Sequence, residues 1–285
     1  MRRHITVFDA INAGFLSIAA FITVFPVWYV FVISVSDGTS YIQDKLHFWP
    51  RTLNFGEYAR VLQAGELTRA FGNSAVITLT GTVLALLVTF SCAYALSRKR
   101  LMGKKIIIPY ILFTMFFSAG LIPYYLLITG LGLKNSLWAL ILPMLTNVYY
   151  MMIMRTYLTG ISVSLEESAK IDGASDYRIL FTIIIPTSKP MLAAIGLFFG
   201  VQYYNDYFNS LLFISTRAKY PLQFLLRELV VNNLANTSAV GGTSTTTVEI
   251  LKMACVVLSI IPILVVYPFL QKYFVQGMML GSLKE

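Results

Sequence analysis

Six apolar runs occupy almost half of this 285-residue chain, and each is close to or above the roughly 20 helical residues that cross a bilayer. The runs lie at residues 12–34, 71–96, 106–128, 136–154, 191–214 and 253–274. They predict an all-α integral membrane protein, with six transmembrane helices in a single transmembrane domain over residues 1–285.

The composition agrees with a lipid environment and excludes an ordinary soluble domain. Hydrophobic residues make up 57% of the chain and charged residues 12%, against about 25% charged residues in a typical soluble domain. Too few polar residues exist to cover a globule of this size, so membrane lipid must surround much of the chain. The net charge of +9 does not indicate a nucleic-acid partner, because the basic residues cluster at the ends of the runs.

The distribution of Lys and Arg predicts the orientation, since cytosolic loops of membrane proteins carry an excess of both. The loop after the second run holds the densest group, which is Arg98, Lys99, Arg100, Lys104 and Lys105. The first outer loop instead balances its charges, with Lys45, Arg51, Arg60 and Arg69 against Asp37, Asp44, Glu57 and Glu66. We therefore expect both termini, and the loop over 160–190, in the cytosol.

The segment SLEESAKIDGASDYRILFTIIIP, residues 164–186, carries the signals of two short helices. Ser164 and Glu167 form a Ser-x-x-Glu capping box for the first helix. Gly173 is placed to end that helix in a left-handed turn, Ser175 with Asp176 to start the second, and Pro186 to stop it. Apolar residues share one face of each helix, namely Leu165 and Ala169 on the first and Tyr177, Leu180 and Phe181 on the second. Such a surface predicts docking onto a partner.

The spacing within this segment follows a known motif. Glu167-Ser168-Ala169 is followed by Gly173 and later by Ile183, Ile185 and Pro186. The pattern resembles the EAA loop of permease subunits of ATP-binding-cassette (ABC) importers, in the sugar branch typified by maltose permeases. Ser168 and Ile185 replace the usual Ala and Leu. The resemblance implies that the loop over 160–190 couples the chain to an ATPase through Glu166, Glu167, Ser168, Ala169, Asp172, Gly173, Ile183 and Pro186.

The tail over 275–285 is similar to the ending of the same family. The matching residues are Gly277, Gly281 and Lys284. The resemblance implies a cytosolic tail that reaches the ATPase subunits, and a frayed terminus is the alternative.

The fifth run carries polar side chains in apolar surroundings. Gln202, Asn205, Asp206 and Asn209 recur at spacings of three and four, which predicts one helix face. A charged carboxylate in hydrocarbon costs about 2.5–3.5 kcal/mol on insertion scales, so such residues tend to face a cavity or a partner. With Tyr203 and Tyr204, this face is a candidate substrate pathway. A polar seam that holds helices together is the alternative.

The resemblance implies the architecture of a type I importer permease and a set of partners. A second homologous permease would complete the pathway, an ABC ATPase dimer would clasp the loop, and an extracytoplasmic solute-binding protein would deliver the sugar. ATP and magnesium would be bound by the ATPase subunits, with no cofactor in this chain, in the inner membrane of a bacterium. We expect an oligosaccharide as cargo; which sugar stays open, an acidic uronate-containing one included.

Chemistry within the chain is not expected. His4 and His47 fall on opposite sides of the membrane, and no G-x-x-x-x-G-K-[ST] loop is present to cradle ATP phosphates. Cys92 and Cys255 lie inside apolar runs and have no metal-ligand spacing. A membrane enzyme is therefore disfavoured, as is an ion-driven secondary transporter, which would need a relay of intramembrane carboxylates. An ABC importer for a peptide, amino acid or phosphate is the nearest alternative.

Overall fold

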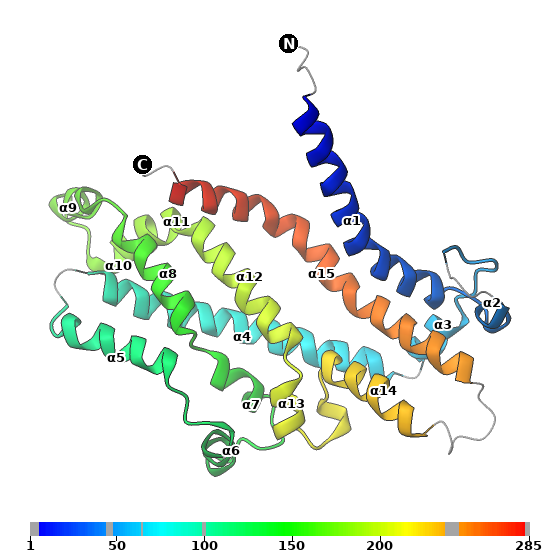
Figure 1. Cartoon of the computed structure of the whole chain (residues 1–285). Coiled ribbons are helices and arrows are strands. Elements are labelled where there is room, and N and C mark those ends of the chain that lie inside the picture. The colour runs from blue at the N-terminus through cyan, green and yellow to red at the C-terminus, as the bar shows by residue number, and fades with distance from the viewer. Residues whose placement is uncertain (1–5, 44–47, 64, 99–100, 237–244, 283–285) are drawn as a thin grey trace. The chain divides into compact units, whose positions relative to one another are not determined.

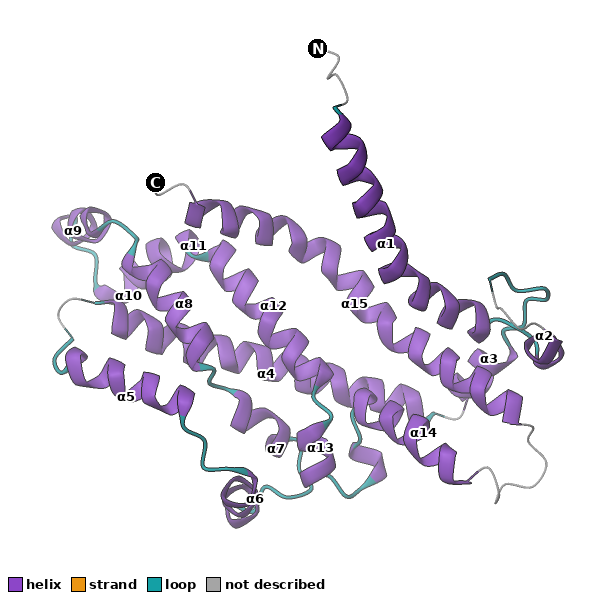
Figure 2. Ribbon diagram, viewed as in Figure 1, coloured by secondary structure: helices purple, strands orange, loops and turns teal. Residues whose placement is uncertain are grey.

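The computed structural model describes residues 6–43, 48–63, 65–98, 101–236 and 245–282. These residues form helices joined by loops, and no strand occurs among them (Figure 2). The predicted all-α fold is confirmed. The chain divides into two compact units, the first formed by Met1–Leu67 and Leu226–Pro262 and the second by Thr68–Leu225 and Ile263–Glu285.

The first unit begins with α1 (Val7–Ser34), whose first turn is closed by a capping box between Thr6 and Asp9. Most apolar side chains of α1 are exposed, as suits a helix surrounded by lipid. The Ser34 hydroxyl at its end shares a hydrogen bond of 2.7 Å with the hydroxyl of Tyr58. The unit also contains α2 (Gly38–Gln43), α3 (Gly56–Gln63), most of α14 (Leu222–Asn236) and the start of α15 (Thr245–Ser282).

The second unit contains the rest of the helices (Figure 1). They are α4 (Glu66–Ser97), α5 (Lys104–Phe116), α6 (Leu121–Gly130), α7 (Trp138–Ile141), α8 (Val148–Thr159), α9 (Val163–Ile171), α10 (Asp176–Ile179), α11 (Ile185–Thr187), α12 (Lys189–Asn205) and α13 (Phe208–Phe213). Helix α8 packs against both α5 and α12. The buried side chains of Leu140, Met154, Leu158, Ile195 and Phe199 belong to one core cluster.

Glycine lets α4 and α12 approach closely. A Cβ atom added to Gly81 of α4 would lie 2.7 Å from the ring of Tyr203 on α12, which is closer than side-chain contacts allow. At Gly196 of α12, an added Cβ would lie 3.1 Å from Leu86 of α4. Small residues at such crossings are typical of helices that pack within membranes.

Three of the described helical segments are long and apolar enough to cross a membrane: Val7–Ser34, Glu66–Ser97 and Val248–Val265. They correspond to the first, second and sixth predicted spans. Two pairs of helices are bent, and each pair could form one more span. They are Lys104–Phe116 with Leu121–Gly130, bent by 109°, and Asp176–Thr187 with Lys189–Asn205, bent by 74°. The prediction of six spans is therefore not confirmed by the described helices.

The predictions of single helices over 106–128 and 136–154 are wrong. The first breaks where Phe117 is extended and Gly120 adopts a φ of +88°. The second breaks before α8, because Asn147 is extended and its side chain accepts a hydrogen bond of 3.2 Å from the N–H of Tyr150. At the second break, the Asn147 side chain gives the backbone a local cap in place of continued helix.

The C-terminal helix is longer than the predicted span over 253–274. Helix α15 continues to Ser282, so Gly277 and Gly281 of the expected tail belong to it. Lys284 lies outside the described residues. The role of the tail stays a prediction.

Candidate functional site

The segment expected to couple the chain to an ATPase folds as two short helices in the second unit. Helix α9 starts after Ser162, whose side chain accepts a hydrogen bond of 3.3 Å from the N–H of Ser164. The predicted capping box of Ser164 and Glu167 is therefore wrong. The helix begins at Val163, which places Ser164 inside the first turn, where its hydroxyl pairs with that of Ser162 at 2.7 Å.

The end of α9 is fixed by a left-handed glycine, as predicted. Gly173 has a φ of +79°, and its N–H bonds to the carbonyl of Lys170 at 3.0 Å. The N–H of Ala174 bonds to the carbonyl of Ala169 at 2.9 Å. These two bonds form a Schellman motif, which satisfies the last carbonyls of the helix and sets the direction of the chain that follows.

The second helix starts as predicted and continues differently. The Ser175 side chain accepts from the N–H of Arg178 at 3.3 Å and caps α10. A π-helical turn over Leu180–Ile184 then leads into α11. Pro186 does not stop the helix, contrary to the prediction. It lies in the first turn of α11, where its missing N–H is tolerated, and the chain bends later, at Ser188.

The two helices leave apolar side chains in solvent. Ile171 is 86% exposed, Tyr177 78% and Phe181 64%, and Leu165 is also exposed. Ala169 and Leu180 instead pack against the core of the unit. Each predicted apolar face is therefore divided. One of its residues packs against the core and anchors the loop, and the exposed residues can contact a partner.

The predicted coupling residues differ in exposure. Glu167, Ser168, Asp172, Gly173 and Pro186 are exposed, whereas Glu166, Ala169 and Ile183 are half-buried. Lys170 and Asp176 form an ion pair of 2.8 Å across the turn between α9 and α10. Because both side chains are exposed, this pair contributes little to stability.

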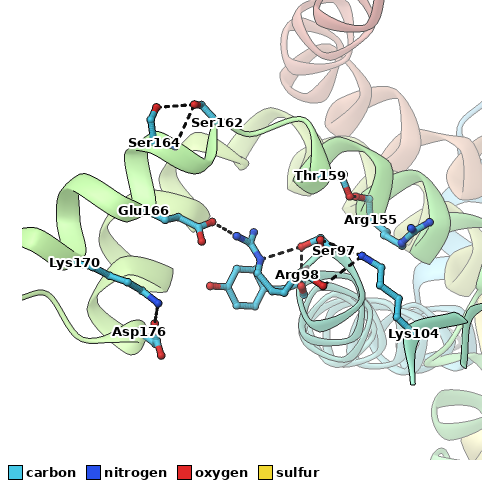
Figure 3. A network of polar contacts seen from close by, with 11 residues as sticks. Ser97, Arg98, Lys104, Arg155, Thr159, Ser162, Ser164, Glu166, Lys170 and Asp176 are labelled. Carbon is cyan, nitrogen blue, oxygen red and sulfur yellow. Dashed lines mark hydrogen bonds and ion pairs between the residues drawn. The ribbon is translucent and has the colours of Figure 1, made fainter. Parts of the chain in front are cut away.

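An ion pair ties the loop to α4. Figure 3 shows the guanidinium of Arg98, just after α4, pointing to the Glu166 carboxylate on α9, with which it pairs. The side chains are only 25% and 15% exposed. The guanidinium also lies 4.3 Å from the centroid of the Tyr94 ring, and its Nε donates to the Ser97 hydroxyl at 3.1 Å. Burial lowers the pKa of Arg98, but Arg stays charged in proteins.

Further cations satisfy the open carbonyls at the end of α4. The Lys104 ammonium donates to the carbonyls of Ser97 and Arg98, both at 3.3 Å, and Arg155 donates to the carbonyl of Leu96 at 3.3 Å. Positive charge at a helix C-terminus also interacts favourably with the negative end of the helix dipole. From the sequence, Arg98 and Lys104 predicted only the orientation of the chain, and their contacts at the end of α4 were not predicted.

The tyrosines of the candidate substrate pathway are buried. Tyr203 donates a hydrogen bond of 2.9 Å to the carbonyl of Ile141, and its ring packs against Gly81. Tyr204 is also buried. The Oε1 atom of Gln202 is buried and has no hydrogen-bond partner among the described residues.

The polar residues that follow do not share one helix face, contrary to the prediction. Helix α12 ends at Asn205, because the backbone of Asp206 is extended, and α13 begins at Phe208. The Asp206 carboxylate accepts from the backbone N–H of Asn209 at 3.3 Å and from its side-chain amide at 2.9 Å. Tyr124 donates to Asn209 at 2.8 Å, and Gln223 donates to Asn205 at 3.3 Å. The break still brings Asp206 and Asn209 together. Their part in a pathway stays a prediction.

Substitution of Asp206 separates the two roles considered for it. If the carboxylate lines the pathway, we expect both Asp206→Asn and Asp206→Ala to reduce sugar uptake several-fold in intact complexes, because either change removes the charge. If it only holds helices together, Asn keeps a hydrogen bond and Ala loosens the bundle by about 0.6–2 kcal/mol. Uptake in vesicles and co-purification measure the two effects. Wild-type uptake in both variants would remove Asp206 from the pathway.

Comparisons with known proteins identify the family, although no family model matches the chain. Protein LplC of Bacillus subtilis (strain 168) is 37% identical over 282 residues, which cover 98% of this chain and 95% of LplC. The polygalacturonan/rhamnogalacturonan transport system permease protein YtcP of the same organism is 37% identical over 280 residues, which cover 97% of this chain and 98% of YtcP.

A solved structure agrees with these relatives. It is the crystal structure of a bacterial ABC transporter involved in the import of the acidic polysaccharide alginate. The TM-score is 0.86 at 34% identity, with 96% of this chain and 99% of that chain covered. The family read from the EAA-like loop is thereby confirmed. The chain belongs to the multi-pass, membrane-embedded permease subunits of carbohydrate ABC importers, which are transport components rather than enzymes.

Proposed function

We propose that this chain forms half of the translocation pathway of an ATP-driven, binding-protein-dependent oligosaccharide importer. In this proposal, the loop over 160–190 transmits the motion of an ATPase dimer to the membrane helices. The observation that carries the proposal is the pair of short helices joined by the Gly173 turn and tied to α4 by Arg98 and Glu166.

The exposed apolar side chains of this loop support docking to a protein. Exposed apolar groups with charged neighbours are typical of interaction sites. Here Ile171, Tyr177 and Phe181 project from the loop, and Glu167 and Asp172 are exposed beside them. Docking would bury the apolar groups and leave the charges at the rim.

The contacts behind this surface support its role as a lever. A turn with satisfied backbone groups keeps α9 and α10 at a fixed angle, and a half-buried ion pair links α9 to the end of α4. A push on the loop would therefore move α4 rather than bend the loop, which suits rigid-body switching. ATP and magnesium would be bound in the ATPase subunits.

The complete importer would contain further subunits. A second, homologous permease would form the other half of the pathway, and an extracytoplasmic binding protein would deliver the cargo. Both termini of this chain would lie in the cytosol of a bacterium with the chain in its inner membrane. The distribution of Lys and Arg supports this orientation.

The names of similar proteins support a polymeric, acidic cargo. YtcP is named for polygalacturonan and rhamnogalacturonan, and the solved transporter is involved in the import of the acidic polysaccharide alginate. We infer that this importer carries oligosaccharides that contain uronic acids.

Ile171→Asp is expected to detach the ATPase subunits. The side chain is 86% exposed on α9, so the change should leave the fold intact and place a charge in the docked interface. Met102→Asp is the matched control, because Met102 is 89% exposed in the loop between α4 and α5, outside the two docking helices. Co-purification of the ATPase and ATP-driven uptake are measured for both. Retention of the ATPase by Ile171→Asp, or equal loss in both variants, would contradict the proposed docking surface.

A further inference from the structure

The segment over residues 48–54, here called the fold-back segment, runs along α1 in the first unit. The indole N–H of Trp28, in α1, donates to the carbonyl of Phe48 at 2.9 Å. The centroids of the Trp28 and Trp49 rings are 5.6 Å apart. Those of the Phe48 ring and of Phe25, in α1, are 5.7 Å apart. These contacts fix the start of the fold-back segment against the side of α1.

The fold-back segment then returns to the end of α1. The N–H of Asn54 donates at 2.8 Å to the carbonyl of Val35, which directly follows the helix. Trp28 and Val35 are seven positions apart, which is about 10 Å of helix at 1.5 Å per residue. The five residues from Trp49 to Asn54 can cover at most about 17 Å, so the chain is long enough for this path. Phe48 and Trp49 thus lie about 10 Å nearer the middle of α1 than Asn54 does.

This level of α1 corresponds to the boundary between hydrocarbon and headgroups. Helix α1 is long and apolar enough to cross a membrane, and it contains no charged residue after Asp9. A hydrocarbon core of about 30 Å takes roughly 20 helical residues, which run from Ala10 to Tyr29. Trp28 is therefore at the end of the core, where membrane proteins are enriched in Trp and Tyr. The proposed orientation of the chain makes this the outer boundary.

The exposed surface of the fold-back segment continues that of α1. The side chain of Phe48 is 53% exposed and that of Trp49 is 71% exposed. The Phe25 ring, next to Phe48, lies 5.5 Å from the ring of Phe21, which is 64% exposed in the middle of the span. Because Phe21 lies at the depth of the acyl chains, the row of rings leads from the lipid-facing side of α1 to Trp49 without a break.

The backbone of the fold-back segment also suits the edge of the hydrocarbon. Backbone groups without a hydrogen bond are costly there, because little water is available to pair with them. The carbonyl of Phe48 is paired with the indole N–H of Trp28, and Pro50 has no N–H that would need a partner.

We propose that the fold-back segment anchors the first outer loop in the lipid bilayer. The rings of Phe48 and Trp49 insert between phospholipids of the outer leaflet, at the level where the acyl chains meet the headgroups. Aromatic rings with a polar edge are stable at this level, because one part is apolar and the other can meet water. The inference goes beyond the proposed function and does not depend on which cargo the importer carries.

The test uses the full importer, reconstituted in bilayers and first measured without its binding protein. The fluorescence that is lost in Trp49→Phe is that of Trp49, so subtracting this variant from the wild type removes the tryptophans of all other subunits. Three quenchers are compared. They are phosphatidylcholine brominated close to the headgroup, phosphatidylcholine brominated at the chain ends, and acrylamide in the water.

Leu53→Trp is the matched control. Leu53 is 66% exposed in the same segment, and it forms an antiparallel bridge with Ser36, beyond the end of α1. An indole at this position lies about 10 Å farther out than that of Trp49. Sugar uptake by both variants should equal that of the wild type, which shows that the importers are folded.

We expect lipid brominated close to the headgroup to reduce the emission of Trp49 by about twofold or more, since aromatic rings settle at the membrane boundary. Lipid brominated at the chain ends should reduce it less, and acrylamide should have little effect. In Leu53→Trp, the added emission should be quenched strongly by acrylamide and weakly by either lipid.

Three results would overturn the inference. In the first, acrylamide quenches Trp49 and neither lipid does, which would place the segment in water. In the second, no quencher reaches Trp49, or addition of the binding protein abolishes the quenching by lipid, which would make the segment a protein-docking surface. In the third, the lipids quench Trp49 and the indole of Leu53→Trp equally. Each of these leaves ATP-driven import by the wild type in place, whereas a wild type without such import would contradict the proposed function and not the lipid contact.

Discussion

Gly173→Leu is expected to reduce ATP-driven sugar uptake by at least about tenfold while the chain stays in the membrane. Gly173 has a φ of +79°, a conformation that costs other L-residues roughly 1–2 kcal/mol, and about 1.4 kcal/mol is a tenfold change in an equilibrium. An added Cβ meets nothing within 4 Å, so the penalty comes from the backbone and not from a clash. The Schellman turn would open, and α9 and α10 would meet the ATPase at a wrong angle.

Gly173→Asn is the control for this prediction, because Asn adopts the left-handed conformation more readily than other non-glycine residues. Uptake should therefore be largely retained in the Asn variant. Immunoblots of membranes show whether the wild type, the Leu variant and the Asn variant are present at equal levels. Normal uptake by the Leu variant, with normal stimulation of ATP hydrolysis, would show that the turn at Gly173 is not needed for coupling.

Arg98→Glu should reduce uptake about as strongly as Gly173→Leu, and the exchange Arg98→Glu with Glu166→Arg should restore part of it. The single change places two carboxylates together in a half-buried position, where like charges repel and desolvation is costly. The exchange restores one positive and one negative charge. It does not restore the contact of Arg98 with the Tyr94 ring, so full recovery is not expected.

The ratio of sugar imported to ATP hydrolysed distinguishes coupling from simple stability here. The single variant should assemble and hydrolyse ATP with little import, since the loop can still dock but no longer moves α4. Lys105→Glu is the control for charge alone, because Lys105 belongs to the same group of basic residues and lies in the first turn of α5. An unchanged ratio in Arg98→Glu, or no recovery in the exchange, would remove the ion pair from the coupling path.

Local signals in the sequence predicted the centre of the coupling loop correctly. Gly173 and Ser175 act through bonds to residues within five positions, so their roles can be read from neighbouring residues alone. The start of α9 was misplaced because two serines compete for the capping position. Ser162 and Ser164 both carry a suitable hydroxyl, and the choice between them depends on where the preceding chain enters.

Breaks within the apolar runs were missed for a different reason. Hydropathy averages over about 19 residues, whereas a break needs only one residue with a local alternative. Gly120 supplies a positive φ, the Asn147 side chain caps α8, and the Asp206 carboxylate accepts a hydrogen bond from an N–H in the first turn of α13. The polar residues near Asp206 were recognised in the sequence. The prediction that they share one helix face was wrong, because α12 ends among them.

The contact between Arg98 and Glu166 was beyond prediction from the sequence. The two residues are 68 positions apart, and their meeting depends on how α4 and α9 pack. The basic residues after α4 predict the same orientation whether or not Arg98 has an acidic partner. Only the fold shows that one of these cations, Arg98, also holds the coupling loop.

ATP dependence of import by the reconstituted complex tests the central claim most directly. Proteoliposomes containing this chain, its partner permease and the ATPase subunits are supplied with loaded binding protein outside and with ATP and magnesium inside. We predict that oligosaccharide accumulates only when ATP is hydrolysed and that a protonophore has no effect. Accumulation without ATP that follows an ion gradient and is abolished by the protonophore would contradict the account.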